Sequence, residues 1–226
     1  MAMKMKSKTL WGFGDSWAYG WGLSPKESNY TYLLSEKLNV NYQNAAESGR
    51  GLGEILELFI KKSSEFSPDD FVLITVPPDT RWYTPAENGN ESLHTLFSWQ
   101  SKYKSFLKLI NCNLYWFYWH HSLFLSSIYN HARRKKVKLV MQHNYGKLSI
   151  IPEFEYVKEA FADSEHSMSF WLSVDDEYDY SLTKGCGPEH AVFQNKKYFI
   201  ENDSHPNQLG HAIIADKLYD AFTRLT

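Results

Sequence analysis

Apolar and polar positions along the chain fall into short apolar runs that alternate with longer segments of helical period. Two compact apolar runs, 9–14 and 69–78, predict buried strands, and the second ends sharply because two prolines close it. Runs at 40–46 and 137–144 predict two further strands. The segment 196–201 is either a short strand or an extended lead-in to the last helix.

Segments with a helical period separate these runs. Apolar residues recur every three to four positions in 29–39, 51–66 and 205–225, and a proline stands near the start of the last segment. The period also predicts one or two long helices between Ser92 and about Lys136, and a further helix from Pro152.

Strands that alternate with helices predict a parallel sheet covered on both faces, with right-handed crossovers. The expected fold class is therefore α/β, a three-layer α/β/α sandwich in one domain, 1–226. In such sheets the site lies outside the carboxyl ends of the strands. Gly-Asp-Ser after the first strand, the segment 76–79 and the loop before the last helix all map near that edge.

Composition and charge exclude several classes of protein. The 226 residues carry a net charge of −2, which provides no overall basic field for nucleic acid. The basic run 131–138 is one cluster at a predicted helix end, where cations suit the helix dipole. The most apolar window, 114–129, is shorter than a membrane span, and the N-terminus lacks the apolar region of a secretory signal. We therefore expect a cytoplasmic protein without nucleic-acid partner or membrane span.

The histidines and cysteines lack the spacing of a metal site, and no glycine-rich phosphate loop with its lysine is present. We expect neither a metal nor a cofactor. The candidate chemistry instead lies in Gly14-Asp15-Ser16 and in His205, with Asp203 two residues before the histidine. A serine hydroxyl needs a base within hydrogen-bond reach, and that base needs a third group to fix its tautomer. The alternative is an ordinary turn serine that caps a helix, together with a histidine paired to Asp203 for structure alone.

Three short blocks resemble the SGNH, or GDSL, hydrolase family of esterases, lipases, thioesterases and carbohydrate deacetylases. They are FGDSWAYGWG at 13–22, NAAESGRGL at 44–52 and DSHPNQLGH at 203–211. The resemblance implies a flavodoxin-like α/β/α sandwich with Ser16 as nucleophile and His205 as general base. It also implies an oxyanion hole formed in part by the backbone N–H groups of Ser16 and Gly49, although Gly49 is equally consistent with a loop glycine of positive φ.

The sequence departs from the family pattern at two positions. Where the family has Gly-x-Asn-Asp after the third strand, this chain has Val-Pro-Pro-Asp, so Pro78 takes the place of the asparagine. Many members have the aspartate three residues before the histidine, where this chain has Asn202. Asp203, two residues before the histidine, is favoured over Asn202 as the orienting group, because a carboxylate also stabilises the imidazolium. Arg81 is a candidate oxyanion donor in place of the asparagine, and pairing of Arg81 with Asp79 is the alternative.

The sequence thus predicts a serine esterase that acts through an acyl-enzyme on a small-molecule or glycan ester, with O-acetyl groups on carbohydrate as a candidate substrate. A catalytically silent binding module of the same fold and an acyltransferase that uses the same residues are the alternatives. Aromatic residues beside the presumed site either fill the end of the sheet or contact substrate, and Trp17 and Trp82 are the candidates for contact.

Overall fold

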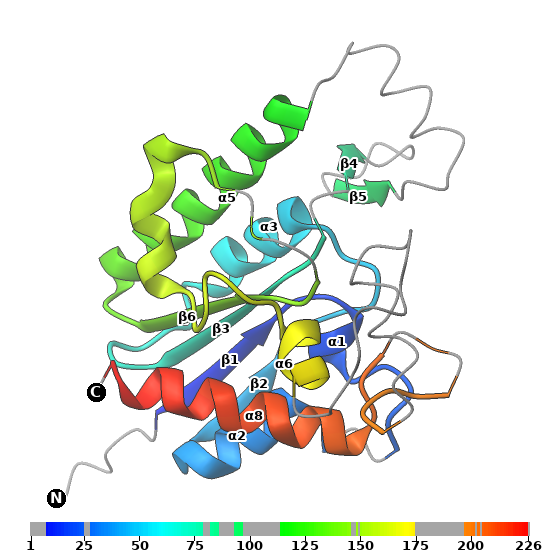
Figure 1. The fold of residues 1–226 in the computed structure, drawn as a ribbon. Coiled ribbons are helices and arrows are strands. Elements are labelled where there is room, and N and C mark those ends of the chain that lie inside the picture. Colours follow the sequence, from blue (N-terminus) through cyan, green and yellow to red (C-terminus); the bar gives the residue numbers. More distant parts are fainter. Residues whose placement is uncertain are drawn as a thin grey trace, which may run out of the picture.

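A parallel sheet of four strands forms the centre of the molecule in the computed structural model (Figure 1). The structure describes residues 8–24, 28–78, 82–85, 93–96, 114–145, 148, 150–174, 197–201, 203 and 205–225. In spatial order the strands are β2 (Asn41–Asn44), β1 (Thr9–Phe13), β3 (Phe71–Val76) and β6 (Lys138–His143). All three neighbouring pairs are parallel, so the carboxyl ends of the strands meet at one edge of the sheet.

Helices cover both faces of this sheet (Figure 1). One face carries α2 (Tyr30–Leu38) and α8 (Gln208–Thr223), and the other carries α3 (Leu52–Lys62), α5 (Leu114–Lys135) and the 3₁₀ helix η2 (Pro152–Ala160). Two short helices, α1 (Ser16–Tyr19) and α6 (Met168–Val174), lie near the carboxyl edge. The α/β/α sandwich that the sequence predicts is confirmed.

Alternating side chains of the strands supply the two halves of the core. Leu10 and Leu73 face the layer of α2 and α8, whereas Phe13 and Ile74 face the layer of α3 and α5. Every residue of β3 is buried, as expected for a central strand covered on both faces. Burial of both faces fixes the register of the strands, and this register sets the position of the residues that follow each strand.

Polar residues determine where the helices begin. The side chain of Asn29 accepts a hydrogen bond from Tyr32 N at 2.8 Å and starts α2, and Asn207 accepts one from Gly210 N at 3.1 Å and starts α8. The last turn of α5, at its carboxyl end, carries Arg133, Arg134 and Lys135. The basic run thus lies at a helix end, as predicted.

The predicted helix start at Ser92 is wrong. Leu93–Leu96 is strand β5, which pairs antiparallel with β4 (Trp82–Pro85) in a separate two-stranded sheet. The regular apolar period that supports a helix begins only at Leu107, so the preceding residues were free to pair with another extended segment. For the segment 196–201, either a short strand or an extended lead-in was predicted. In its described part, 197–201, Phe199 forms one isolated bridge, to Pro206, and no strand is formed.

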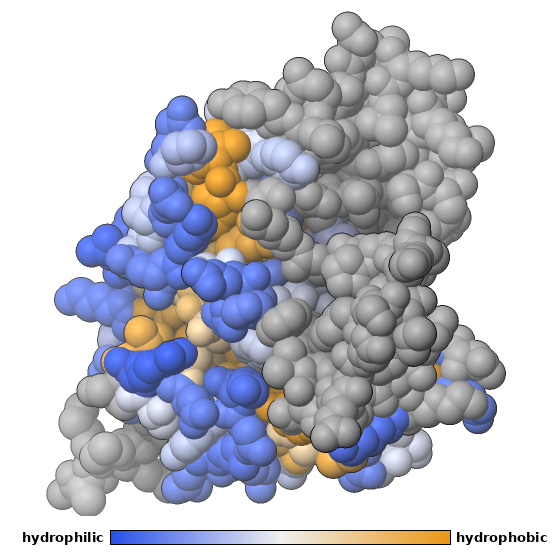
Figure 2. Space-filling model, in the orientation of Figure 1, coloured by the Kyte–Doolittle hydropathy of each residue, from blue (hydrophilic) through white to orange (hydrophobic). Residues whose placement is uncertain are grey.

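The surface over α2 and α8 is mainly hydrophilic, as expected for helices with one face on the core and the other in water (Figure 2). No helix in the described part of the chain combines the length and the apolar character needed to cross a bilayer.

Candidate active site

Ser16 is the first residue of α1, and two residues separate it from the carboxyl end of β1. Gly14 makes this turn possible, because a Cβ there would lie 2.7 Å from the Cβ of Thr75 and 2.8 Å from that of Ala18. Asp15 is the helix cap, and its Oδ1 accepts a hydrogen bond from Trp17 N at 3.1 Å. Asp15 therefore has a structural role in this turn.

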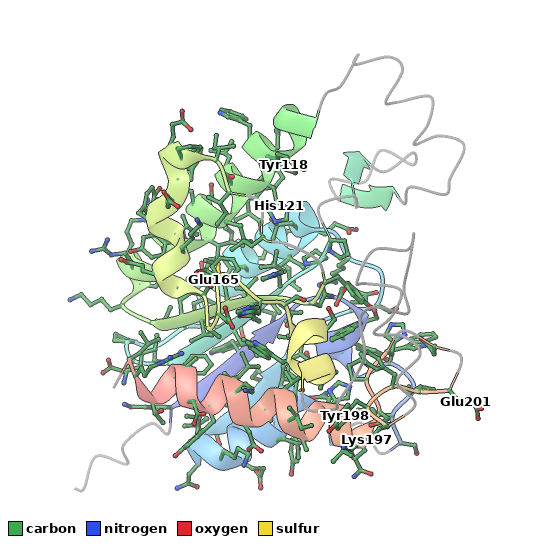
Figure 3. All side chains as sticks on the ribbon, viewed as in Figure 1. Tyr118, His121, Glu165, Lys197, Tyr198 and Glu201 are labelled. Carbon is green, nitrogen blue, oxygen red and sulfur yellow. The ribbon has the colours of Figure 1, made fainter. Side chains whose placement is uncertain are left out.

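His205 reaches the same edge of the sheet from the loop 197–207. The loop folds back on itself, since Ile200 N donates to His205 O at 2.9 Å and Asn207 N donates to Tyr198 O at 2.8 Å. Gly210 in α8 permits the helix to pack closely against the backbone of Tyr198, because a Cβ at Gly210 would lie 2.5 Å from Tyr198 O. Lys197 and Tyr198 lie beside the start of α8, and Glu201 projects outward from the loop (Figure 3).

Asp203, His205 and Ser16 form a continuous hydrogen-bonded chain. Nδ1 of His205 bonds to Oδ1 of Asp203, and Nε2 of His205 lies 2.7 Å from Ser16 Oγ. The carboxylate holds the ring proton on Nδ1, so that Nε2 is free to accept the serine proton. Ser16 is 4% exposed, and the side chains of His205 and Asp203 are 18% and 32% exposed. The three groups thus have the relationship needed to activate a serine.

Beneath this chain lies a fully buried polar cluster of Tyr30, Thr75 and His211. Tyr30 OH and Thr75 Oγ1 are 2.5 Å apart, and Tyr30 N donates to His211 Nδ1 at 3.0 Å. Burial, together with a smaller effect of nearby His205, lowers the pKa of His211 to about 3. Burial also raises the pKa of Tyr30 well above its usual value. Both groups are therefore neutral near pH 7 and act as packed polar residues rather than as acids or bases.

The residues expected to bind an oxyanion are only partly described. Gly49 lies in the loop after β2 with φ +87°, and Glu47 N in the same loop donates to Gly14 O at 3.1 Å. This bond attaches the loop to the turn that carries Ser16. Pro78 lies just beyond the end of β3, whereas Arg81 and Asp79 lie outside the described residues.

The two tryptophans expected to contact substrate have different outcomes. Trp17 is fully buried, and its Nε1 donates to Tyr145 OH, so it is a core residue and not an exposed ring. The side chain of Trp82 lies outside the described part of the structure. Trp21 is 47% exposed, and its ring lies 6.2 Å from that of His205. Trp21 is therefore the exposed aromatic residue found beside the described site.

Asn144 and Tyr145 contact the serine turn, although sequence reasoning did not single them out. Asn144 Nδ2 donates to Asp15 Oδ2 at 3.0 Å. The ring of Tyr145 packs edge-on against that of Trp17, with 4.8 Å between the ring centroids. The available signal was their place at the carboxyl end of the fourth predicted strand, where Asn144 is the last residue and Tyr145 the next, at the same edge as Ser16.

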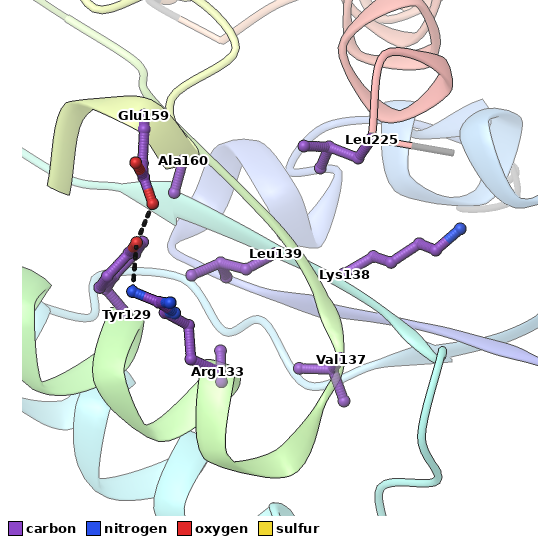
Figure 4. Close-up of a pocket in the computed structure, with 9 residues that line it drawn as sticks. Tyr129, Arg133, Val137, Lys138, Leu139, Glu159, Ala160 and Leu225 are labelled. Carbon is purple, nitrogen blue, oxygen red and sulfur yellow. Dashed lines mark hydrogen bonds between the residues drawn. The ribbon is translucent and has the colours of Figure 1, made fainter. Parts of the chain in front are cut away.

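A cavity of about 510 Å³ lies away from this site (Figure 4). Val137, Lys138 and Leu139 line it at the amino end of β6, opposite the edge at which Ser16 lies. Arg133 donates to Tyr129 OH at 3.3 Å, and Tyr129 in turn bonds to Glu159 across the cavity. Its lining residues include none of Ser16, Asp203 and His205.

Comparison with known proteins gives structural neighbours only. No protein-family model matches the chain, and no curated protein matches its sequence. Among solved structures, TesA has a TM-score of 0.56 at 14% identity, and the match covers 97% of this chain and 100% of TesA. A lipolytic protein of the G-D-S-L family from Desulfitobacterium hafniense DCB-2 has a TM-score of 0.53 at 12% identity. The match covers 95% of this chain and 99% of that one.

A member of the lipolytic protein G-D-S-L family from Veillonella parvula DSM 2008 gives a TM-score of 0.51 at 14% identity, with coverage of 96% of this chain and 100% of that one. These matches extend over nearly the whole chain, so the likeness includes the order of strands and helices and not one motif alone. The chain has the α/β/α fold of the SGNH/GDSL hydrolases.

Proposed function

We propose that the protein is a serine hydrolase that cleaves carboxylic esters through an acyl-enzyme. The observation that carries this proposal is the hydrogen-bonded chain from Asp203 through His205 to Ser16, located after β1 at the carboxyl edge of the sheet. A serine that merely caps a helix needs no imidazole at 2.7 Å from its hydroxyl. The arrangement supports catalysis over a structural role for the same residues.

The residues support a two-step reaction. Ser16 Oγ attacks the ester carbonyl carbon as its proton passes to His205 Nε2, and the carbonyl oxygen becomes an oxyanion. The intermediate collapses, the bond to the alcohol oxygen breaks, and Nε2 returns the proton to that leaving oxygen. Water then repeats the sequence on the acyl-enzyme and releases the acid and free Ser16. Asp203 stabilises the imidazolium formed in each step.

The oxyanion is assigned to the backbone N–H groups of Ser16 and Gly49, with Arg81 as a further donor. Pro78 offers neither a side-chain donor nor a backbone N–H, so it cannot donate a hydrogen bond to the oxyanion as the family asparagine does. The hydrogen bond from Glu47 to Gly14 supports the proximity of the Gly49 loop to the serine.

The substrate proposed is a short acyl ester, with the O-acetyl groups of carbohydrate as the favoured class. The exposed ring of Trp21 beside His205 supports it, because aromatic rings pack well against the apolar face of a sugar. The sugar would then be the leaving alcohol, next to the imidazole that protonates it.

Labelling with a serine-directed fluorophosphonate, followed by mass mapping, tests the nucleophile. Modification of Ser16 in the wild type and its loss in Ser16→Ala would support the proposal, whereas an unmodified Ser16 would favour a silent binding module. Product analysis with acetylated sugar and excess alcohol then separates the two enzymes: free acetate indicates a hydrolase, and an acetylated acceptor indicates an acyltransferase.

A further inference from the structure

Two consecutive residues after β6 hold the two neighbours of Ser16. Asn144 Nδ2 donates to Asp15 Oδ2 at 3.0 Å, and Tyr145 OH accepts a hydrogen bond from Trp17 Nε1. Asp15 precedes the serine and Trp17 follows it. The segment is separated from the turn by more than a hundred residues in sequence, yet it contacts the nucleophile's turn on both sides.

Asn144 is itself held firmly. Its side chain is fully buried. Its backbone N–H donates to Val76 O at 3.2 Å, and its backbone carbonyl oxygen accepts from Ser169 N at 3.0 Å. The backbone of this residue therefore joins the end of β3 to the start of α6. The backbone at Asn144 is thus anchored to two other elements, and its buried side chain extends from this fixed point to Asp15.

Asp15 depends on this support. The carboxylate is fully buried, with Oδ1 bonded to Trp17 N and Oδ2 bonded to Asn144. A buried carboxylate that loses a hydrogen-bond donor is strongly destabilised, so it would turn to find another. Such a rotation would disturb the cap of α1 and with it the direction of Ser16 Oγ.

We infer that Asn144 and Tyr145 are positioning residues for the nucleophile. Asn144 fixes the carboxylate that caps α1, and Tyr145 fixes the indole on the other side of Ser16. Together they hold Ser16 Oγ at its distance of 2.7 Å from His205 Nε2. Neither residue is required to touch substrate, and this inference rests on the proposed serine hydrolase activity.

Two of the variants that test it remove one contact each. Asn144→Leu keeps a similar volume and loses the donor, and Tyr145→Phe keeps the ring packing and loses only the hydroxyl. Asn144→Asp faces Asp15 with a second carboxylate. In the swap Asp15→Asn with Asn144→Asp, the amide at position 15 donates to the carboxylate at 144 and still accepts from Trp17 N.

The readouts are the rate of fluorophosphonate labelling of Ser16, kcat and KM on a p-nitrophenyl ester, and the melting temperature. We expect Asn144→Leu to lower kcat and the labelling rate by about 10- to 100-fold with little change in KM, because small misplacement of a reacting atom is costly. Tyr145→Phe should lower both rates by a smaller factor. Asn144→Asp should lose activity further as the pH rises, because two ionised carboxylates repel, and the swap should recover most of the wild-type rate.

Three outcomes decide between the possibilities. Folded Asn144→Leu and Tyr145→Phe that label at the wild-type rate would overturn the inference, even if their melting temperatures fall, because the residues would then be structural only. If Asn144→Leu does not fold, Tyr145→Phe and failure of the swap to recover activity serve the same purpose. A wild type that is not labelled at Ser16 would overturn the proposed function itself, and this inference with it.

Discussion

Nε2 of His205 lies 2.7 Å from Oγ of Ser16, although 189 positions separate the two residues. His205 lies in the loop before the last helix, and Ser16 follows the first strand of the sheet. Both sit at the carboxyl edge because β1 is a central strand and the 197–207 loop is folded onto the start of α8. This distance carries the functional proposal.

Removal of either member of the Ser16 and His205 pair should abolish ester hydrolysis. We expect Ser16→Ala and His205→Ala to lose activity to a similar extent, because members of one catalytic unit are strongly non-additive. Hydrolysis of short p-nitrophenyl esters and thermal melting provide the measurements. Unchanged activity of pure Ser16→Ala would disprove its role as nucleophile.

The carboxylate of Asp203 should matter through the histidine tautomer. We expect Asp203→Asn to lower kcat by roughly 10²- to 10⁴-fold, because an amide can no longer stabilise the imidazolium and favours the wrong tautomer. Asn202→Ala is the matched comparison and should have much less effect. If the Asn202 variant is the more damaging, Asn202 and not Asp203 orients the ring.

Arg81 should contribute to the oxyanion hole that Pro78 cannot complete. Loss of one preorganised donor typically lowers kcat by about 10²- to 10³-fold. Arg81→Ala should therefore lower kcat far more than it changes KM in steady-state kinetics. Full activity in this variant would show that Arg81 serves another role, such as an ion pair with Asp79.

Trp21 should contribute to substrate binding and not to chemistry. We expect Trp21→Ala to raise KM for an acetylated sugar by roughly 3- to 10-fold, in line with the usual value of an aromatic contact. Trp21→Phe should retain most of the affinity, and kcat/KM for ethyl acetate should change little in either variant. An equal loss for both esters would argue against a sugar platform.

His211 should make the fold less stable in acid. Its pKa is about 3 in the folded chain, against about 6.5 when exposed, so the unfolded chain binds a proton between these pH values that the folded chain does not. The free energy of unfolding should therefore fall as the pH falls, by up to about 1.4 kcal/mol per pH unit from this residue.

His211→Gln tests that pH dependence, because glutamine retains an acceptor for Tyr30 N–H and does not titrate in this range. Urea unfolding at pH 7 and pH 5 should show a shallower loss of stability for the variant than for the wild type. Equal losses in the two proteins would contradict a neutral, buried His211 in the folded state.

The sequence by itself predicted the strands of the central sheet and the main helices, and it supplied candidates for the chemistry of the site. Apolar runs bounded by glycine and proline are local signals, so β1 and β3 could be recognised from the residues alone. Gly-Asp-Ser and the aspartate-histidine pair are also local, and they identified Ser16, Asp203 and His205 as candidates. The start of β5 could not be recognised, because its pairing with β4 depends on a partner elsewhere in the chain.

Only the tertiary structure decided which groups meet. The sequence does not distinguish the buried Trp17 from the exposed Trp21, because exposure depends on what packs against each ring. Nor does it indicate that Asn144 and Tyr145 hold the residues on either side of Ser16. These contacts join separate elements across the carboxyl edge, where strand order and register set the neighbours. That arrangement is a property of the packed sheet and not of any one segment.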